Sequence, residues 1–149
     1  MSDTTTEPTE AITLEAFVPA ELLMDANART NAEVTVDKAF VATLKAHAAA
    51  SPEFPVHGDQ TSRARCGNAV PVTIVRRPDG QLRVRTGHRR TIGCLRAGAY
   101  VLGFIAGDEG DERADQRARL IEQWQENHHR EDMTVHDDTA LLLLSLIHI

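Results

Sequence analysis

The sequence is short of the features that mark several classes of protein. It holds two cysteines, Cys66 and Cys94, and no CxxC pair, which argues against a zinc ribbon or a disulfide-stapled scaffold. It has no apolar run of about 18 residues, so we expect no membrane span. The polar, acidic start, MSDTTTEPTE, resembles neither a signal peptide nor a transit peptide. We therefore expect a cytoplasmic protein with reduced thiols.

Positive charge is scarce overall but concentrated in the middle of the chain. Lys and Arg number 16 against 22 Asp and Glu, a net charge of -6, which excludes a uniformly basic nucleic-acid-binding surface. Residues 63–98 nevertheless hold nine arginines and one acid, Asp79, a balance of +8 that leaves -14 for the rest of the chain. This pattern predicts either an anion pocket or arginines that alternate with apolar residues and face solvent.

The 149 residues have the length of one ordinary domain. We expect a disordered tail over residues 1–10, a single domain over 11–132 and the start of a truncated helical region over 133–149. The run over 140–149 supports the last expectation, because it is too apolar for a free surface and too short for a domain.

Periodicity and turn signals predict an α+β domain with a small mixed sheet. Its clearest part is a β-hairpin whose strands cover 70–75 and 82–85, joined by the turn Arg77-Pro78-Asp79-Gly80. Loops are expected over 25–31, 51–68 and 107–112, and Thr35 is the expected cap of the first helix. The remaining expected elements are strands over 12–17 and 100–106 and helices over 36–49, 89–97 (ended by Gly98), 113–127 and from 135 onward.

The first candidate site is Thr86-Gly87-His88-Arg89-Arg90, where a predicted strand ends and a helix begins. Gly87 permits a tight turn and close backbone approach. The N–H groups at a helix start favour an anion, two arginines supply donors suited to phosphate, and His88 adds a pH-sensitive donor. Arginines at a helix N-terminus oppose the helix dipole unless an anion is bound, so we favour phosphate binding over arginines that merely decorate a helix start.

The second candidate site is Glu126-Asn127-His128-His129-Arg130, at the end of a predicted helix. Glu126 and Asn127 offer adjacent oxygen ligands, suited to a Mg²⁺ ion that also contacts substrate phosphates. Arg130, one turn further on, can reach the same phosphates. Zinc is disfavoured, because neighbouring histidines on a helix do not face the same way. The alternative is a solvated helix end.

Neither cysteine predicts catalysis. Cys94 lies among apolar residues of a predicted helix and is interpreted as a buried structural thiol. Cys66 lies in the predicted loop over 51–68, where Arg63 and Arg65 would lower its pKa, but neither a partner histidine nor a second cysteine accompanies it.

Together the two candidate segments resemble the ParB partition proteins. TGHRRTI over 86–92 is similar to the GERR or GHRR box of that family, and ENHHREDM over 126–133 is similar to its ENLQREDL box, at a comparable separation. The hairpin PVTIVRRPDGQLRVRTG also runs into the arginine box as in the family. Asn27-Ala28-Arg29 is a weaker echo of the family's N-terminal Asn-Pro…Pro-Arg segment. The resemblance covers roughly residues 12–140.

The resemblance implies a domain that binds CTP with Mg²⁺, hydrolyses it weakly if at all, and gates a clamp of two such domains around DNA. It implies DNA (in the full-length protein), a second copy and a partition ATPase as partners, no membrane, and a location at the nucleoid or a plasmid. The residues implied at the nucleotide are Thr86, Gly87, His88, Arg89, Arg90, Arg130 and Arg29, with Glu126 and Asn127 at Mg²⁺ and in hydrolysis.

The sequence also departs from the family's pattern. His88 stands where Glu is commoner, His128-His129 replaces Leu-Gln, and the N-terminal segment lacks its prolines and Gln. Two other functions would keep the fold: a transcriptional or plasmid regulator without nucleotide turnover, and a ParB-like nuclease, for which Glu126 alone supplies a carboxylate. The related sulfiredoxins have a catalytic cysteine where Gly87 stands, so sulfinate repair is not expected.

Overall fold

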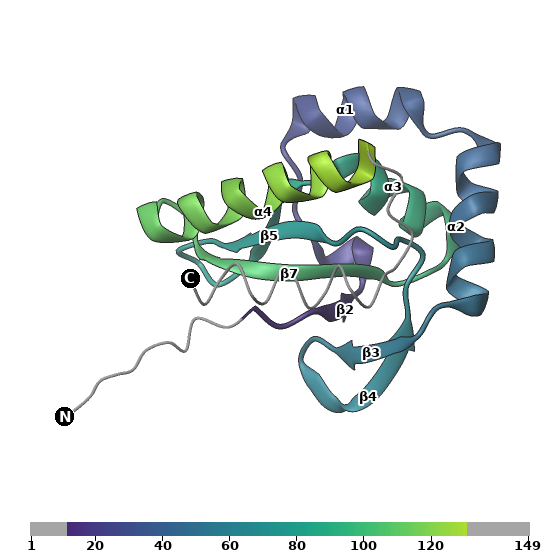
Figure 1. Cartoon of the computed structure of the whole chain (residues 1–149), viewed down its shortest axis with the longest axis horizontal. Coiled ribbons are helices and arrows are strands. Elements are labelled where there is room, and N and C mark those ends of the chain that lie inside the picture. Colours follow the sequence, from purple (N-terminus) through teal and green to yellow (C-terminus); the bar gives the residue numbers. More distant parts are fainter. Residues whose placement is uncertain (1–11, 131–149) are drawn as a thin grey trace.

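The computed structural model describes residues 12–130, which form an α+β domain (Figure 1). A mixed sheet of six strands has the order β4-β3-β2-β7-β5-β6. The predicted tail over 1–10 and the helical region over 133–149 lie outside the described residues. The elements are β2 (Glu15–Phe17), the 3-10 helix η1 (Pro19–Glu21), α1 (Ala26–Thr35), α2 (Lys38–Ala50), β3 (Glu53–Val56), β4 (Asp59–Arg65), β5 (Val72–Arg76), β6 (Leu82–Thr86), α3 (His88–Ala97), β7 (Val101–Asp108) and α4 (Glu112–Arg130).

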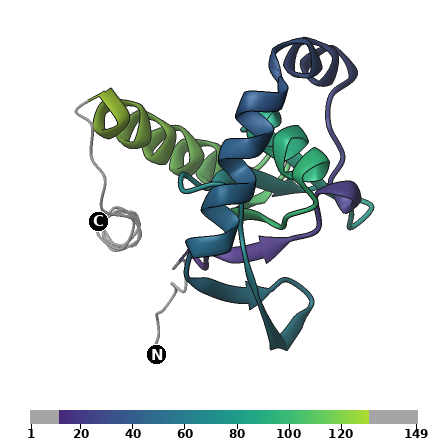
Figure 2. The same cartoon turned by 90° about the vertical axis from the view of Figure 1, so that its right-hand side faces the viewer.

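Strand β7 lies in the middle of the sheet and pairs with β2 and β5. The pairing is antiparallel to β2 and parallel to β5. Side chains alternate along a strand, so β7 contributes to both faces of the sheet. Val101 packs with Leu44 of α2 and Cys94 of α3, whereas Phe104 packs with Ile121 of α4. Helices α2 and α3 therefore cover one face and α4 the other, and Figure 2 shows α4 and α2 on different sides of the sheet.

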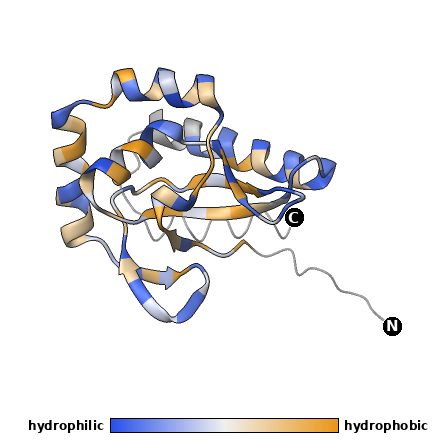
Figure 3. Ribbon diagram, turned by 180° about the vertical axis from the view of Figure 1, so that it is seen from behind, coloured by the Kyte–Doolittle hydropathy of each residue, from blue (hydrophilic) through white to orange (hydrophobic). Residues whose placement is uncertain are grey.

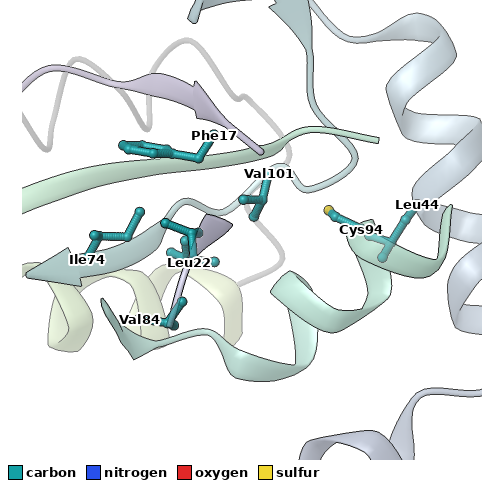
Figure 4. Packing of buried hydrophobic residues seen from close by; sticks show 8 residues of the cluster. Phe17, Leu22, Leu44, Ile74, Val84, Cys94 and Val101 are labelled. Carbon is teal, nitrogen blue, oxygen red and sulfur yellow. The ribbon is translucent and has the colours of Figure 1, made fainter. Parts of the chain in front are cut away.

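The largest core cluster lies between the sheet and α3, and Figure 4 shows it from close by. Each of its members is at most 5% exposed, and burying one such aliphatic or aromatic side chain contributes about 1.5–3 kcal/mol. Hydrophobic residues accordingly follow the central strands, with hydrophilic ones on the outer turns of α4 (Figure 3). The cluster consists of Phe17, Leu22, Leu44, Val72, Ile74, Val84, Cys94 and Val101.

The elements with strong local signals are confirmed. The hairpin β5–β6 turns at Gly80, whose φ of 89° is left-handed and whose N–H donates to the Arg77 carbonyl at 2.8 Å. Helix α3 ends at the left-handed Gly98, whose N–H donates to the Leu95 carbonyl at 3.3 Å. In α4 the apolar residues at core spacing are Ala114, Ala118, Ile121 and Trp124; the first three are buried, and Trp124 is partly buried against the same cluster.

The loop predicted over 25–31 is wrong, because most of it is the first part of α1. The polar residue that indicated a loop is instead a helix cap: the Asp25 carboxylate accepts hydrogen bonds from the N–H groups of Asn27 at 3.0 Å and Ala28 at 3.2 Å. Burial of Ala32 against Ile92 of α3 then holds the helix on the domain. This long-range contact has no counterpart in the local sequence.

The cap predicted at Thr35 is also wrong. Thr35 is the last residue of α1, and its hydroxyl donates to the Ala32 carbonyl at 2.9 Å. Helix α2 begins two residues later than predicted, and the Asp37 carboxylate accepts the cap bond from the Phe40 N–H at 2.9 Å. A carboxylate placed immediately before the helix thus caps it.

The loop predicted over 51–68 is wrong as well, because it forms the antiparallel hairpin β3–β4. The chain reverses at Gly58, which has a φ of 87°. Phe54 and Ala64 lie opposite each other and pack on the cluster around Cys66. Because β4 is an edge strand and presents its other residues to solvent, it lacks the apolar pattern that usually predicts a strand.

The two thiols are buried in different core clusters. Burial raises the pKa of Cys94 to about 12, as expected of a structural thiol. Burial likewise raises the pKa of Cys66 to about 12, so the lowered pKa predicted from Arg63 and Arg65 is wrong. The reason is that Cys66 is 0% exposed among Ala16 and Leu102, away from the solvent that the exposed arginines face. In the part of the chain described, no helix is long and apolar enough to cross a membrane.

Asn68 joins β7 to the segment that leads into β5. The side chain is 3% exposed. Its amide nitrogen donates to the carbonyls of Val70 and Leu102, each at 2.9 Å, and its oxygen accepts from the Leu102 N–H at 2.8 Å. Three buried backbone groups are thereby paired, which is what a buried amide must achieve to be stabilising.

Replacing Asn68 by Leu should lower the free energy of unfolding by about 3 kcal/mol or more. The substitution leaves three backbone groups without their partner, each worth roughly 1–3 kcal/mol when buried. The measurement is denaturant unfolding followed by far-UV circular dichroism. The exposed Asn31→Leu, on α1, is the control and should change stability by less than about 0.5 kcal/mol. Equal stability of the two variants would contradict the role assigned to Asn68.

Candidate functional site

The turn between β6 and α3 is built around Gly87. Its φ of 97° is left-handed, and a Cβ atom there would lie 2.5 Å from Val72 Cγ1 and 2.8 Å from Val72 Cβ. The Gly87 carbonyl accepts from the N–H of Thr91 at 3.0 Å and from its hydroxyl at 2.9 Å. The N–H groups of the first turn of α3 have no acceptor within the helix, so this turn presents free donors, and the missing Cβ of Gly87 lets Val72 pack directly against it.

His88, the first residue of α3, has a buried ring nitrogen without a partner. Its Nε2 atom makes no hydrogen bond among the described residues. Burial, and then the charge of Arg83, lower the pKa of His88, against a smaller opposing effect of Asp25 and the Val84 backbone. Buried polar atoms are nearly always paired in proteins. A ligand at this helix N-terminus could therefore supply the hydrogen-bond partner that Nε2 of His88 lacks.

Arg89 lies on the outside of α3 and contacts the joint between α1 and α2. Its guanidinium carbon lies 3.8 Å from the centre of the Phe40 ring. Its Nε donates to the Thr35 hydroxyl at 3.2 Å and a terminal nitrogen donates to the Thr35 carbonyl at 3.3 Å. The side chain is exposed, so these bonds compete with water and can be exchanged for bonds to a ligand.

Arg90 is half-buried and binds the chain just before β5. One terminal nitrogen donates to the Val70 carbonyl at 2.9 Å and to the Pro71 carbonyl at 3.0 Å. This guanidinium therefore has a structural task, which the sequence alone does not reveal.

The helix that carries the second candidate segment packs against this turn. Gln125 of α4 places its amide nitrogen 3.5 Å from the Pro71 carbonyl, the same oxygen that Arg90 contacts. At the other side of the turn the Thr86 hydroxyl donates to Glu122 of α4 at 3.0 Å. Two segments about 40 residues apart in sequence thus meet around Pro71.

The backbone of the second segment belongs to the last turns of α4. Glu126, Asn127 and Arg130 follow Gln125 directly in this helix, but their side chains lie outside the described part of the structure. Among the side chains that are described, no three His, Cys, Asp or Glu residues gather in a way that could hold a metal ion. The predicted Mg²⁺ ligands therefore stay a prediction.

Acidic residues of α4 and of the turn that precedes it form ion pairs with the arginines of β6. Arg83 pairs with Glu109 at 2.7 Å, and Arg85 pairs with both Asp115 and Glu122, the latter at 3.2 Å. The acidic flank of the sequence thus folds onto its basic centre. These strand arginines already have carboxylate partners, whereas Arg89 and Arg90 at the Gly87 turn donate to hydroxyl and carbonyl oxygens instead.

Arg29 lies on the exposed surface of α1. Its Nε lies 3.3 Å from Glu33, one turn along the same helix. The residue of this region that acts electrostatically on His88 is Asp25, the cap of α1.

The side chains that the sequence analysis missed are Glu122 and Gln125. Glu122 lies one turn before Glu126, and the (i, i+4) spacing that places both on one helix face was the available signal.

No protein-family model, curated protein or solved structure matches this chain.

Replacing Gly87 by Ala should lower the free energy of unfolding by about 2–5 kcal/mol. A left-handed conformation costs a non-glycine residue roughly 1–2 kcal/mol, and the clash with Val72 adds about 1–3 kcal/mol. Gly58→Ala is the matched control, because Gly58 has a φ of 87° and open space around it. It should show the conformational cost alone, in denaturant unfolding. Equal losses in the two variants would mean that the contact with Val72 does not constrain the turn.

His88 should make the protein less stable as the pH falls below neutrality. Its pKa is lowered in the folded state, so below about pH 6.5 the unfolded chain binds the proton more readily and folding is opposed. The contribution is complete above the unfolded pKa and is lost as pH falls toward the folded pKa. His88→Gln removes this titrating group. In denaturant titrations the free energy of unfolding of the parent should therefore fall relative to that of the variant as the pH is lowered from 7.5 to 5.5. Parallel pH profiles would show that His88 titrates as it does in the unfolded chain.

Proposed function

We propose that this chain is a ParB-type domain that binds CTP with Mg²⁺ at the Gly87 turn. The observation that carries the proposal is the shared Pro71 carbonyl, which accepts from Arg90 at 3.0 Å and Gln125 at 3.5 Å. Through it, the helix bearing Glu126 and Asn127 packs against the arginine segment. An anion-binding helix start and a metal-competent carboxylate and amide are then parts of one site.

The residues of the turn fit a triphosphate. A phosphate group would accept from the first-turn N–H groups of α3, which have no acceptor within the helix. The Nε2 atom of His88 would gain the partner that it lacks. Arg89, which is exposed, would leave Thr35 and turn to the phosphates. Glu126 and Asn127 would hold Mg²⁺, which would neutralise part of the phosphate charge.

In this proposal the bound nucleotide controls a conformational change, and its hydrolysis is not the source of energy for that change. CTP bound between α3 and α4 would favour closure of two copies around DNA, with slow hydrolysis reopening the clamp. DNA, a second copy of the chain and a partition ATPase would be the partners, at the nucleoid or on a plasmid. Thr86, which contacts Glu122, and Arg130 would adjust the position of α4 to the nucleotide.

A second candidate function is a regulator of the same fold that binds no nucleotide. The observation in its favour is that both arginines of the first segment are engaged within the protein, Arg89 with Thr35 and Phe40, Arg90 with Val70 and Pro71. In this reading the two arginines hold helices and strands in place, and partner binding would not depend on CTP.

Calorimetric titration with CTP and Mg²⁺ separates the two functions. We expect saturable binding of CTP, with UTP, ATP and GTP binding at least tenfold more weakly. Arg89→Ala should weaken CTP binding tenfold or more, because a charged hydrogen bond contributes about 1.5–3 kcal/mol. Asn127→Ala should reduce binding only when Mg²⁺ is present.

The matched control is Arg63→Ala, an exposed arginine on β4. It should leave CTP affinity unchanged within twofold. Absence of binding up to millimolar CTP would overturn the proposal in favour of the nucleotide-free regulator. Equal affinity for all four nucleotides would leave an anion site but reject a CTP switch.

A further inference from the structure

The chain contains two lysines, and both line one groove. Of its 16 basic residues, 14 are arginines, and the lysines are Lys38 and Lys45 of α2. They border a groove of about 570 Å³ together with Arg96 of α3. Their separation of seven residues corresponds to two helical turns, about 10 Å along one face. In a chain with a net charge of -6, this is a local concentration of positive charge.

The remaining lining of the groove is largely apolar. Its apolar residues are Val41, Ala42 and Val36, of which Val36 is 6% exposed and also packs in the core with Ile92. Figure 2 shows α2 on the side of the molecule that faces the viewer. An apolar floor flanked by cations is more specific than either feature alone, because scattered surface lysines or valines need no explanation.

The charged side chains of the groove differ in whether they have partners within the protein. Asp37, the acid in the lining, uses its carboxylate to cap α2 through the Phe40 N–H at 2.9 Å. Arg96 is held in place by donation to the Val36 carbonyl at 2.9 Å. The side chains of Lys38 and Lys45 make no hydrogen bond or ion pair with residues 12–130, so within these residues their ammonium groups have no paired carboxylate.

We propose that this groove docks an acidic amphipathic helix of a partner protein. Apolar residues of such a helix at (i, i+3, i+4) spacing would pack on Val36, Val41 and Ala42. Flanking carboxylates would meet Lys38, Lys45 and Arg96, giving both attraction and orientation. A nucleic-acid backbone would use the cations but leave the apolar floor uncovered, so the chemistry favours a protein helix. None of Gly87, His88, Arg89 and Arg90 lines the groove, so we expect the helix to dock without the nucleotide.

Because the chain has two lysines, docking can be tested directly without any amino-acid substitution. Reductive methylation with ¹³C-formaldehyde labels Lys38, Lys45 and the terminal amine, so each lysine gives its own NMR signal. The probe is a designed helix of about 18 residues with Leu at (i, i+3, i+4) positions and Glu elsewhere. Its matched control carries Lys in place of Glu. Both lysine signals should shift saturably with the acidic helix and remain in place with the basic one.

Variants then test the charges with the same probe, fluorescently labelled and followed by anisotropy. The double variant K38E/K45E should raise the Kd for the acidic helix tenfold or more. R63E/R65E changes the net charge equally on exposed β4 and should leave the Kd within twofold. Circular dichroism confirms that both variants are folded, and the NMR titration decides the matter if one is not.

Three results would overturn the proposal. They are no lysine shift with 1 mM acidic helix, equal shifts with the basic helix, and tighter binding of a 20-base-pair DNA duplex at the same ionic strength. CTP titration in the presence of the acidic helix distinguishes the two proposals. We expect the acidic helix to leave the CTP affinity unchanged. A protein that binds no CTP should still bind the acidic helix, and a variant that no longer binds the helix should still bind CTP.

Discussion

The position of the Val70–Pro71 segment is the constraint on which the rest of the site depends. Asn68 fixes its start by binding the Val70 carbonyl and both backbone groups of Leu102. The Val70 and Pro71 carbonyls then become acceptors for Arg90. A buried amide in the segment between β4 and β5 thus positions the acceptors of Arg90. Gln125 of α4 contacts the same Pro71 oxygen at 3.5 Å, so α3 and α4 share this anchoring point.

This arrangement explains why the arginine segment serves structure and candidate function together. Arg90 binds the chain that precedes β5, whereas the exposed Arg89 lies over the half-buried Phe40 ring and donates to the Thr35 hydroxyl. The first is a scaffold for the turn, and the second can change partners at little cost. A helix start in which Arg90 is fixed and Arg89 can change its partners suits a ligand that must be released again.

Sequence patterns predicted the elements whose signals are local. The β5–β6 hairpin follows from a turn with Gly80, and α3 follows from Gly98 at its end, since both depend on backbone conformation alone. The α1 helix and the β3–β4 hairpin were not predictable in the same way. Ala32 is buried by α3, and Phe54 by residues of β2, β4 and β7, so their environments exist only in the folded chain.

The site could be predicted in part for the same reason. The anion-binding potential of the Gly87 turn follows from consecutive residues, and the structure brings α4 to that turn. The partners of individual arginines did not follow, because Arg85 meets Glu122 and Arg89 meets Thr35 across gaps of 37 and 54 residues. Charge counting locates such arginines but does not show which carboxylates fold back on them.

The order of the strands has a consequence for how the chain acquires its fold. Both hairpins, β3–β4 and β5–β6, close locally and can form as soon as they are synthesised. The strand that joins them is β7, which lies centrally yet follows both hairpins in the chain. Until residues 101–108 insert between β2 and β5, the chain holds two separate hairpins with unpaired inner edges. Completion of the sheet is therefore a late, long-range step, and the interval before it exposes the chain to mispairing with other chains.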